Sequence, residues 1–539
     1  MERWHNIYFL FIKSVIIFIM TKKDNAILLR DGNEVSPWQT GIPTVVAPKP
    51  EGSGLKIYDC LIIGAGITGL TTALLLQRAG KNTMIAEANS IGFGTTSGTS
   101  AHINTFADTT YAEAESAFGE KGAKGFANAI NEGFAIIREN IREFRMHCDF
   151  EEKEGYLYAE DEDQVKQLND VYQGALKVGV QAEYINKFPF PVPFQKALKF
   201  GSQAQFHPIK YLQALLHQYL QQGGVLLEKT FIDRVTTGDG LHTAHAGNKT
   251  IKAKQVIYAT HVPPGWNAFN FLCAPYRSYV MAVKLKSHAY PDALVYDMQE
   301  PYHYFRSHVI DGEQLLLVGG NDHKTGHDDP EKAFETLEKY VRKYFSVSSV
   351  KYKWSSQYYI PVDGLPYIGQ MPLTAKGIYC ATGFNGNGMM LGSIAGKILA
   401  DLVCGKESPY QSLFDPCRIK PIDGFKEFVS ENADVAYHFI ADRFHIHETD
   451  SVKRITPGTG KVVEVDGQKI AAYRDEDGGI HALSPVCTHA KCVVGWNQEE
   501  KSWDCPCHGA RYDIDGKVLN GPALRPLEKI ATPETLLQS

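Results

Sequence analysis

The C-terminal region of the chain contains cysteine and histidine residues whose types and spacing could hold a metal. Cys487 and His489 form one pair in the segment Cys-Thr-His, and Cys505 and His508 form a second pair in Cys-Pro-Cys-His. Four of the ten cysteines lie between positions 487 and 507, whereas the other six are scattered without a common spacing. Scattered cysteines are typical of an intracellular protein, and a cluster in such a chain indicates a metal site. Thiolate and imidazole ligands leave zinc and an iron–sulfur cluster as the candidates.

A second candidate for chemistry is a glycine-rich turn near residue 60. A short buried strand is predicted over 58–63 before the turn. A helix over 68–79 and a strand over 83–86 follow the turn, and this strand leads into Glu87. This order is typical of a dinucleotide-binding unit, in which the helix N-terminus faces the phosphates and the acid accepts the ribose hydroxyls. The turn comprises Gly64, Ala65, Gly66, Ile67, Thr68 and Gly69. The pattern does not distinguish FAD from NAD.

Three further segments resemble the D-amino-acid-oxidase-like superfamily, which includes glycine, sarcosine and amine oxidases. The loop over 91–98 resembles the flavin loop of that family, and the strand ending at Val235 resembles the one that contacts the adenine side of FAD. A glycine-rich turn over 383–388 opens a helix, and in the family such a turn faces the flavin ring. The resemblance covers residues 56–405 and implies FAD as the cofactor. The further FAD contacts that it implies are Gly94, Thr95, Thr96, Ser97, Gly383, Asn385, Gly386, Asn387, Gly388 and Met389.

Other residues are candidates for contact with flavin or substrate. Some members of the superfamily attach FAD covalently through a histidine in the part of the chain that holds His102; we interpret His102 as lining the flavin pocket without such a bond. Tyr302, Tyr304 and Arg306 alternate on one predicted strand and therefore share a face. An arginine beside tyrosines could clamp a substrate carboxylate. An arginine packed on aromatic rings or paired with a nearby acid is an equally good interpretation.

The cysteine and histidine cluster resembles the Rieske 2Fe–2S pattern, in which two thiolates hold one iron and two imidazoles hold the other. The ligands implied by matching the motif are Cys487 and Cys505 for one iron, and His489 and His508 for the other. The cytochrome-type subgroup further implies a disulfide between Cys492 and Cys507 and a covering loop over 520–523. Zinc is the weaker alternative, because the Cys-x2-Cys pairs typical of zinc sites are absent.

The length of the chain and these motifs predict several domains. At 539 residues the chain is too long for one ordinary domain. We expect an α/β FAD-binding Rossmann-like domain with an α+β substrate domain of the D-amino-acid-oxidase-like type, plus a small all-β Rieske domain. The expected ranges are an apolar extension over 1–20, an N-terminal arm over 21–55, the oxidoreductase over 56–404, a linker with a bracing helix over 405–450, and the Rieske domain over 451–539. Within the oxidoreductase, the substrate portion is predicted to be mostly helical over 110–185 and strand-rich over 275–360.

Charge and hydropathy limit the partners and the location of the protein. The net charge of −6 provides no overall positive potential that would bind the phosphate backbone of a nucleic acid. Nucleic acid is therefore not an expected partner. The apolar run over 7–20 is short for a bilayer span and contains Lys13. We therefore interpret Met20 as the translation start, with a signal anchor or an interfacial helix as alternatives, and expect a cytoplasmic protein with membrane association only if residues 7–20 are translated.

The two implied cofactors together predict a function. A flavin takes up two electrons at once, whereas a 2Fe–2S cluster passes them singly. The combination predicts a dehydrogenase that oxidises an amine or amino acid and passes electrons to an external acceptor, either a protein or a quinone-like molecule. One alternative is an NAD(P)H-dependent reductase, although a second glycine-turn unit is not found in the sequence. Another is an electron carrier or redox sensor without a substrate. A neutral amine needs no side-chain base, so no catalytic acid or base is assigned.

Overall fold

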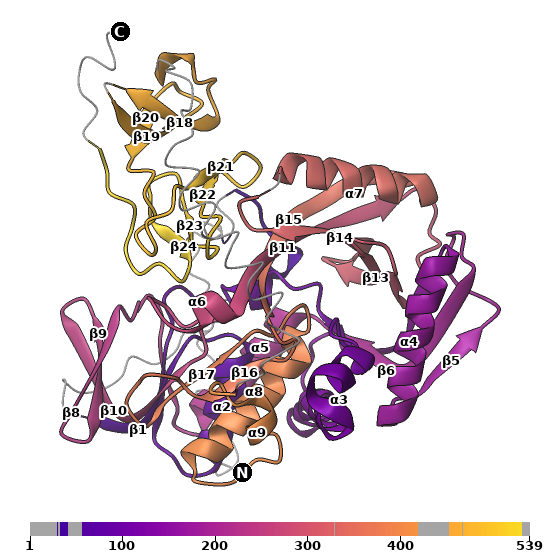
Figure 1. The fold of residues 1–539 in the computed structure, drawn as a ribbon, viewed down its shortest axis with the longest axis horizontal. Coiled ribbons are helices and arrows are strands. Elements are labelled where there is room, and N and C mark those ends of the chain that lie inside the picture. The colour runs from indigo at the N-terminus through magenta and orange to yellow at the C-terminus, as the bar shows by residue number, and fades with distance from the viewer. Residues whose placement is uncertain are drawn as a thin grey trace, which may run out of the picture.

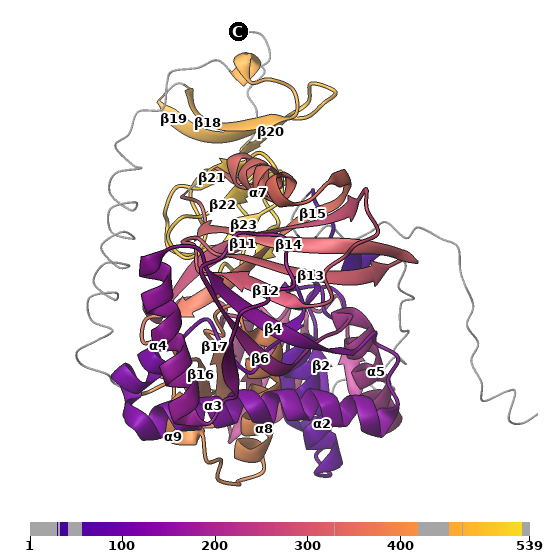
Figure 2. The same ribbon diagram turned by 90° about the vertical axis from the view of Figure 1, so that its right-hand side faces the viewer.

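The computed structural model describes residues 30, 33–40, 56–327, 329–418, 452–465 and 467–530. Within these ranges the chain forms two large sheets with their helices and a small β domain at the C-terminal end (Figures 1 and 2). The predicted extension over 1–20, most of the arm over 21–55 and the expected bracing helix of the linker lie outside the described residues. Among the described helices, none has the length and apolarity needed to cross a membrane.

The first sheet contains the strands expected to belong to the dinucleotide-binding unit, and it forms from short apolar segments. Its strands run in the order β16-β17-β10-β1-β2-β7, with β8 and β9 as an extension on β10. Pairing of β1 with β2 and β10 is parallel, as continuous apolar segments buried on both faces require. The bounds are β1 (Ile57–Ile63), β2 (Thr83–Ala86), β7 (Val225–Leu227), β8 (Arg234–Gly238), β9 (Leu241–Ala246), β10 (Lys249–Tyr258), β16 (Tyr367–Gln370) and β17 (Ile378–Thr382).

Two helices of this part pack closely against each other because glycines of α8 lie at their contact with α2. The helices α2 (Ile67–Arg78), α5 (Pro208–Gln221) and α8 (Gly388–Val403) belong to this part of the fold. A Cβ atom at Gly396 of α8 would lie 2.8 Å from the Cβ of Thr71 on α2, so only glycine allows this approach. The starts of α2 and α8 therefore lie side by side at the edge where β1 and β17 end, which directs both free N-termini to one place.

The second sheet forms the wall of the substrate portion. Its order is β15-β11-β14-β13-β12-β4-β6-β3, with β5 paired to β6. The bounds are β3 (His102–Ile103), β4 (Glu151–Ala159), β5 (Ala182–Ile185), β6 (Lys196–Gln205), β11 (Cys273–Leu285), β12 (Leu294–Asp297), β13 (His303–Ile310), β14 (Glu313–Lys324) and β15 (Val347–Pro361). The helices of this part are α3 (Tyr111–Phe144), α4 (Glu162–Val178) and α7 (Pro330–Tyr344). The predicted helices within 110–185 are present as α3 and α4, but β4 separates them, and the predicted strand region contains α7.

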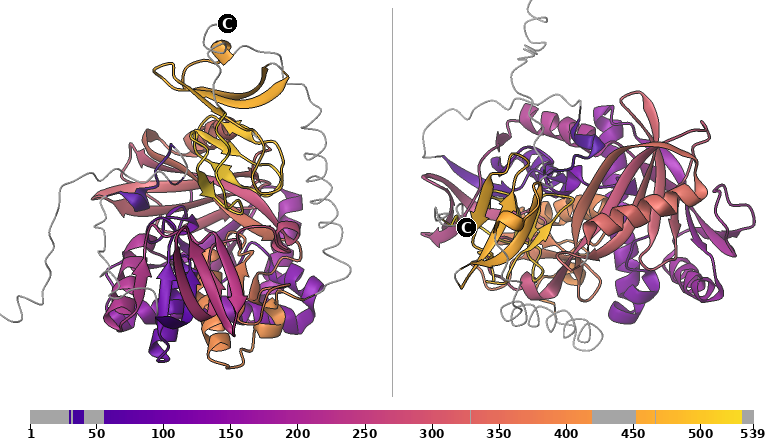
Figure 3. Two further views of the ribbon diagram at one scale, coloured as in Figure 1. Left: turned by 90° about the vertical axis from the view of Figure 1, so that its left-hand side faces the viewer. Right: turned by 90° about the horizontal axis from the view of Figure 1, so that it is seen from above.

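The C-terminal domain is built from two small β-sheets and lies beside the rest of the chain (Figure 3). One sheet contains β18 (Thr459–Val465), β19 (Gln468–Arg474) and β20 (Ile480–Leu483), and the other contains β21 (Gly495–Asn497), β22 (Ser502–Asp504), β23 (Arg511–Tyr512) and β24 (Val518–Asn520). Trp503 and Tyr512 are fully buried in its core. Short helical segments elsewhere are η1 (Pro37–Gln39), η2 (Thr95–Ser97), α6 (Phe269–Leu272), α9 (Gln411–Phe414) and η3 (Val452–Arg454). The predicted fold class is confirmed.

Candidate functional site: a flavin cavity beside a cysteine–histidine cluster

The glycine turn between β1 and α2 has the geometry that a pyrophosphate requires. Gly64 has φ +107°, and a Cβ there would lie 2.5 Å from the carbonyl oxygen of Ala259. A Cβ at Gly69 would lie 2.0 Å from the oxygen of Gly64, so glycine at this position lets the helix start directly against the turn. The N-terminus of α2 consequently projects free N–H groups into the space above the turn, where an anionic group is stabilised.

Glu87 lies at the end of β2 in the position expected for the ribose-binding acid. One carboxylate oxygen accepts a hydrogen bond from the N–H of Ala65 at 2.8 Å, and the other accepts from the N–H of Asn89 at 2.8 Å. These bonds fix the carboxyl group beside the glycine turn. Burial raises the pKa of Glu87. Each oxygen retains a second lone pair for a hydroxyl donor.

A cavity of about 580 Å³ extends from this turn to the second sheet. Its volume is in the range of cofactor and ligand sites. Of the predicted site residues, those that line it are Gly64, Gly66, Ile67, Thr68, Glu87, Gly94, Thr95, Thr96, His102, Tyr302, Tyr304, Asn385, Gly386, Asn387, Gly388 and Met389. The structure thus brings together the two glycine turns, the loop over 91–98 and the tyrosine strand, although they are far apart in the sequence.

Four predicted contacts are next to the cavity without lining it. Ala65 and Gly69 shape the first turn, as described above. The hydroxyl of Ser97 donates to the carbonyl oxygen of Phe93 at 3.0 Å and so stabilises the flavin loop. Gly383 has φ +74° and packs against Pro361. These residues support the cavity wall, and direct contact with a cofactor is not indicated for them.

The structure places Val235 outside the cavity, so it does not support the predicted contact with the adenine side of FAD. The expected continuous strand breaks after β7, and the chain passes the cavity at residues 230–232 before β8 begins. Val235 itself pairs with Ala244 on β9 and lies outside the cavity lining. Ile232, three residues earlier in the chain, lines the cavity and is buried.

The structure also does not support Arg306 as a carboxylate clamp. It is fully buried, and its Nη1 donates to the carbonyl oxygen of Ala101 at 2.7 Å. Its guanidinium group lies 5.2 Å from the ring of Trp38, in the short helical segment η1. The side chain is therefore used for packing on an aromatic ring and for backbone contacts, and it does not line the cavity. The alternative interpretation of this arginine, packing on aromatic rings, describes it better.

His102 lines the cavity with both ring nitrogens engaged. Nδ1 lies 2.8 Å from the Ser100 hydroxyl, and Nε2 lies 3.4 Å from the carbonyl oxygen of Phe305. Burial lowers the pKa of His102 to about 3, so the ring is neutral. These contacts favour a pocket-lining role, and the absence of a covalent bond to FAD stays a prediction.

Two carboxylates in the cavity were missed by the sequence analysis. Asp108 precedes α3, and one of its oxygens accepts a hydrogen bond from the N–H of Gly386 at 2.8 Å. Asp322 is on β14, and its Oδ2 accepts from the hydroxyl of Tyr358 at 2.8 Å. Burial raises the pKa of Asp108 to about 6 and that of Asp322 to about 7. No motif marks either residue, because the site forms only when distant strands pair.

The four predicted cluster ligands come together at the tips of two loops. The rings of His489 and His508 are 5.0 Å apart, and all four ring nitrogens are buried without a hydrogen-bond partner in the described part of the chain. Burial lowers the pKa of His489 to about 4 and that of His508 to about 3, so both are neutral imidazoles, the form that binds metal. Buried polar atoms without partners are costly unless a ligand satisfies them. The histidines therefore fit a metal cluster.

The cysteines of the two loops divide into two pairs. Cys487 and Cys505 are in hydrogen-bond contact, and the bond from Cys505 lowers the pKa of Cys487 to about 6. The hydroxyl of Tyr512 lies 3.2 Å from the Cys487 sulfur. Cys492 and Cys507 form a disulfide that joins the loops, as the resemblance implied. Although the sulfurs of Cys492, Cys505 and Cys507 lie within 4.8 Å of one another, a disulfide offers no thiolate, so this group is not a ligand set.

The histidine edge of this cluster faces the flavin part of the chain. The ring of Trp266 lies 5.4 Å from that of His489 and 6.0 Å from that of His508. The N–H of Gly265 donates to the carbonyl oxygen of Pro522 in the covering loop at 2.8 Å. Residues 517–521 of the same domain, with Ala523, Leu524 and Pro526, also line the flavin cavity. The cluster site and the flavin cavity are therefore neighbours.

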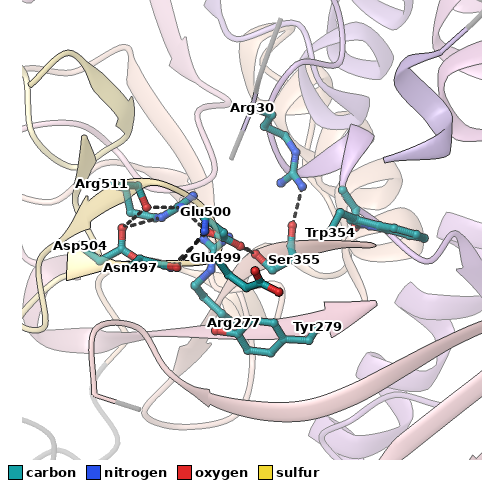
Figure 4. Close-up of polar contacts among 12 residues, drawn as sticks. Arg30, Arg277, Tyr279, Trp354, Ser355, Asn497, Glu499, Glu500, Asp504 and Arg511 are labelled. Atoms are coloured by element: carbon teal, nitrogen blue, oxygen red, sulfur yellow. Dashed lines mark hydrogen bonds and ion pairs between the residues drawn. The ribbon is translucent and has the colours of Figure 1, made fainter. Parts of the chain in front are cut away.

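A buried ionic network holds the two parts in this arrangement (Figure 4). Glu500 of the C-terminal domain lies between Arg277 on β11 and Arg511 on β23, with both Glu500 oxygens 2.8 Å from Arg277 Nη2. The Nε of Arg511 also donates to Asp504 at 2.9 Å. All four side chains are 0–5% exposed. Two cations and two anions balance, which is the condition for charges to be buried without a large penalty.

Substituting Gly69 with alanine should deplete the protein of flavin. The added methyl group would lie 2.0 Å from the Gly64 oxygen, and relief of such overpacking costs about 1–3 kcal/mol. Displacement of the turn should weaken FAD binding by about 5- to 150-fold. The ratio of flavin to protein absorbance after purification measures this. Gly201→Ala is the matched control, because no atom lies within 4 Å of the added group there; equal flavin content in both variants would contradict the assignment of the turn.

Comparisons with known proteins agree with this geometry. A family model described as "FAD dependent oxidoreductase" matches residues 59–402, and one described as "Rieske [2Fe-2S] domain" matches residues 444–531. A putative Rieske 2Fe-2S iron-sulfur protein, YhfW, of Bacillus subtilis is 35% identical over 475 residues, covering 88% of this chain and 93% of that protein. Gamma-glutamylputrescine oxidoreductase of Escherichia coli is 23% identical over 64% of this chain and 84% of its own. The crystal structure of glycine oxidase from Geobacillus kaustophilus matches with a TM-score of 0.56 and 18% identity, over 67% of this chain and 99% of that one.

Proposed function

Because the chain belongs to the FAD-dependent oxidoreductase family and carries a Rieske [2Fe-2S] domain, we propose that it oxidises the C–N bond of an amine or amino acid and delivers the electrons through the Rieske cluster to an external acceptor. When bound, FAD supplies two-electron oxidation and the 2Fe–2S cluster supplies one-electron transfer. Conversion of the substrate amine to an imine releases two electrons and two protons, and water then gives a carbonyl compound and ammonia. The two electrons reach a one-electron acceptor protein or a quinone-like molecule.

The observation that carries this proposal is the cavity lined by both domains. Residues 517–521 of the C-terminal domain, which run through β24 into the covering loop, line the same cavity as the glycine turns of the flavin part. A carrier that exchanged electrons only with outside partners would have no need for this contact. The contact supports electron transfer between the two cofactor sites within one chain.

The residues of the chain have defined tasks in this proposal. The N-terminus of α2 stabilises the phosphates, and Glu87 accepts the ribose hydroxyls. The turn over 383–388 directs the N-terminus of α8 into the cavity beside the start of α2, where its positive potential favours an electron-rich ring. The covering loop limits access of water, which strengthens every polar contact within the cavity.

The relatives support amines and amino acids as the substrate class. One is a gamma-glutamylputrescine oxidoreductase, and the fold is also that of a glycine oxidase. Both proteins are named for nitrogen compounds with an oxidisable C–N bond.

Anaerobic titration tests the proposal directly. The purified protein is mixed with amines, amino acids and NAD(P)H, and flavin absorbance and the EPR signal of the cluster are followed together. We expect one amine or amino acid to bleach the flavin, after which the signal of the reduced cluster rises. Rapid reduction by NADH would instead indicate a reductase. Reduction by dithionite alone would indicate a carrier or sensor and would contradict the proposal.

A further inference from the structure

The charges that line the cavity are unevenly distributed. Among the described residues, the acidic and basic side chains of the lining are Glu87 at the nucleotide end, Lys517 just before β24, and the pair Asp108 and Asp322. No arginine lines the described cavity. The substrate portion thus presents carboxylates where recognition of an amino-acid carboxylate would need a guanidinium or ammonium group.

Asp322 lines the cavity, and one of its two carboxylate oxygens is available to a ligand. Its Oδ2 accepts a hydrogen bond from Tyr358, whereas Oδ1 is buried and makes no hydrogen bond of standard geometry among the described residues. The nearby Ser278 hydroxyl lowers the pKa of Asp322, but it also lies 2.9 Å from the Tyr304 hydroxyl. A buried carboxylate oxygen without a donor is costly, so a ligand that donates to it is stabilised. Asp108 is near enough for its charge to raise the pKa of Asp322 further. Two neighbouring carboxylates favour a cation between them.

Tyrosine rings surround the two acids. The side chains are Tyr296, Tyr302, Tyr304 and Tyr358, all in the cavity lining. Tyr304 lies directly over Gly319, where a Cβ would be 2.1 Å from the ring, and its hydroxyl reaches Ser278 at 2.9 Å. The rings of Tyr302 and Tyr304 are 5.9 Å apart. Aromatic faces attract a desolvated ammonium group, whereas they offer little to a carboxylate.

We infer that the substrate is an alkylammonium compound without a carboxylate on its reacting carbon, bound through Asp322 with Asp108 and the surrounding tyrosine rings. This inference rests on the proposed function, since it names the substrate class of the same site. It separates amines from α-amino acids, which the proposed function leaves together.

The same carboxylate is suited to the first proton transfer. A bound ammonium group must lose one proton before the C–N bond can be oxidised, because the nitrogen lone pair has to be free. Oδ1 of Asp322 can accept that proton, and a base whose pKa is near the working pH does so efficiently. The proton moves from nitrogen to Oδ1, and no electron is transferred in this step.

Binding of a ligand that cannot be oxidised tests the inference without turnover. tert-Butylammonium has no hydrogen on its nitrogen-bearing carbon, and pivalate carries the same tert-butyl group on a carboxylate instead of an ammonium group. Perturbation of the flavin spectrum or calorimetry of the flavin-loaded protein gives each Kd. We expect tert-butylammonium to bind, and pivalate to bind at least about tenfold more weakly, which is the scale of one charge-assisted hydrogen bond. Tighter binding of pivalate would overturn the inference.

Asp322→Asn should weaken tert-butylammonium binding by about 10- to 100-fold, because the charge is lost while an oxygen remains for the Tyr358 hydroxyl. Asp311→Asn is the matched control. It removes one negative charge from the exposed turn of the same β13–β14 hairpin, and its backbone (φ +50°) suits asparagine. An unchanged Kd in Asp322→Asn would contradict the assignment. If that variant does not fold, the comparison of the two ligands on the unaltered protein still decides.

The affinity for tert-butylammonium should also fall as the pH is lowered through about 7. Asp322 is neutral below its pKa of about 7 and a carboxylate above it, while an alkylammonium ion stays charged from about pH 6 to 9. The groups that face Asp322 are Asp108, Ser278, Tyr302, Tyr304, His303 and Tyr358. Titration of Asp108 near pH 6 acts in the same direction. Affinity that is constant from pH 6 to 8, or that rises on acidification, would overturn the inference.

Matched substrates separate this inference from the proposed function. Butylamine, phenethylamine and putrescine are the decarboxylated forms of norvaline, phenylalanine and ornithine. We expect the amines to reduce the flavin at least about tenfold faster at equal concentration. Reduction by the amino acids alone would leave the proposed function standing and refute the inference. If neither the amines nor the amino acids reduce the flavin while dithionite does, the proposed function itself is refuted.

Discussion

Replacing Cys487 with serine should abolish electron delivery to a one-electron acceptor while leaving the flavin in place. Cys487 is buried at the tip of its loop, in contact with Cys505, and it does not line the flavin cavity. Loss of outer-shell partners alone costs about 10- to 100-fold in metal affinity or activity, so loss of a ligand should cost more. We expect the EPR signal of the reduced cluster to disappear and turnover with ferricyanide-type acceptors to fall by more than about a hundredfold.

The rate at which substrate reduces the flavin serves as the internal control for this variant. Substrate should still bleach the flavin at the original rate, because the cavity residues are untouched. Cys417→Ser is the matched control, since this cysteine is exposed and far from the cluster loops in sequence. An intact EPR signal in Cys487→Ser would contradict the ligand assignment. An intact turnover with a lost signal would instead show that electrons leave from the flavin directly.

The cluster ligands could be predicted from the sequence because their chemistry is local. Two loops supply all four ligands, and the residue types alone limit the metal. The first glycine turn was predictable for the same reason, since strand, turn, helix and acid follow within about thirty residues. In both cases the residues that act together are close in the chain. Their relative geometry is then fixed by one supersecondary unit.

Arg306 and Val235 show where such reasoning stops. Alternation placed Tyr304 and Arg306 on one face correctly, but it gives no measure of how far the cavity extends along β13. Arg306 is two residues and about 7 Å further along the strand, where Trp38 from a distant segment covers it. Val235 lies outside the cavity because the strand that was expected to be continuous breaks before it.

The helix α7 could have been predicted within the region expected to be strands. Its sequence has an amphipathic period, and Ala333, Phe334, Leu337 and Val341 are buried.

Asp322 and Glu500 could not have been found from the sequence. Glu500 contacts Arg277 across 223 residues, and Asp322 meets Asp108 only after the second sheet has formed. Neither residue belongs to a motif. Their roles depend on burial, which pairing of distant strands decides.

Glu500→Gln should uncouple the two cofactor sites. The substitution leaves Arg277 and Arg511 buried with Asp504 as the remaining anion, and breaking a buried pair in this way costs about 3–5 kcal/mol. Part of this cost falls on the contact between the domains, because Arg277 belongs to the flavin part. We expect substrate to reduce the flavin at the original rate, and reduction of the cluster to become at least about tenfold slower. Stopped-flow absorbance for the flavin and freeze-quench EPR for the cluster measure the two steps.

Two further variants separate docking from folding. Glu499→Gln removes the neighbouring charge, which is partly exposed and 3.7 Å from Lys353, and a surface pair of this kind contributes about 0–1 kcal/mol. It should leave both rates unchanged. The double variant Arg277→Gln with Glu500→Gln restores the charge balance, since Arg511 and Asp504 remain paired at 2.9 Å. It should recover thermal stability while cluster reduction stays slow, because the charged contact across the domains is still missing. If cluster reduction recovers together with stability, the network contributes to folding only, and the position of the cluster is set by the contacts of Trp266 and the covering loop instead.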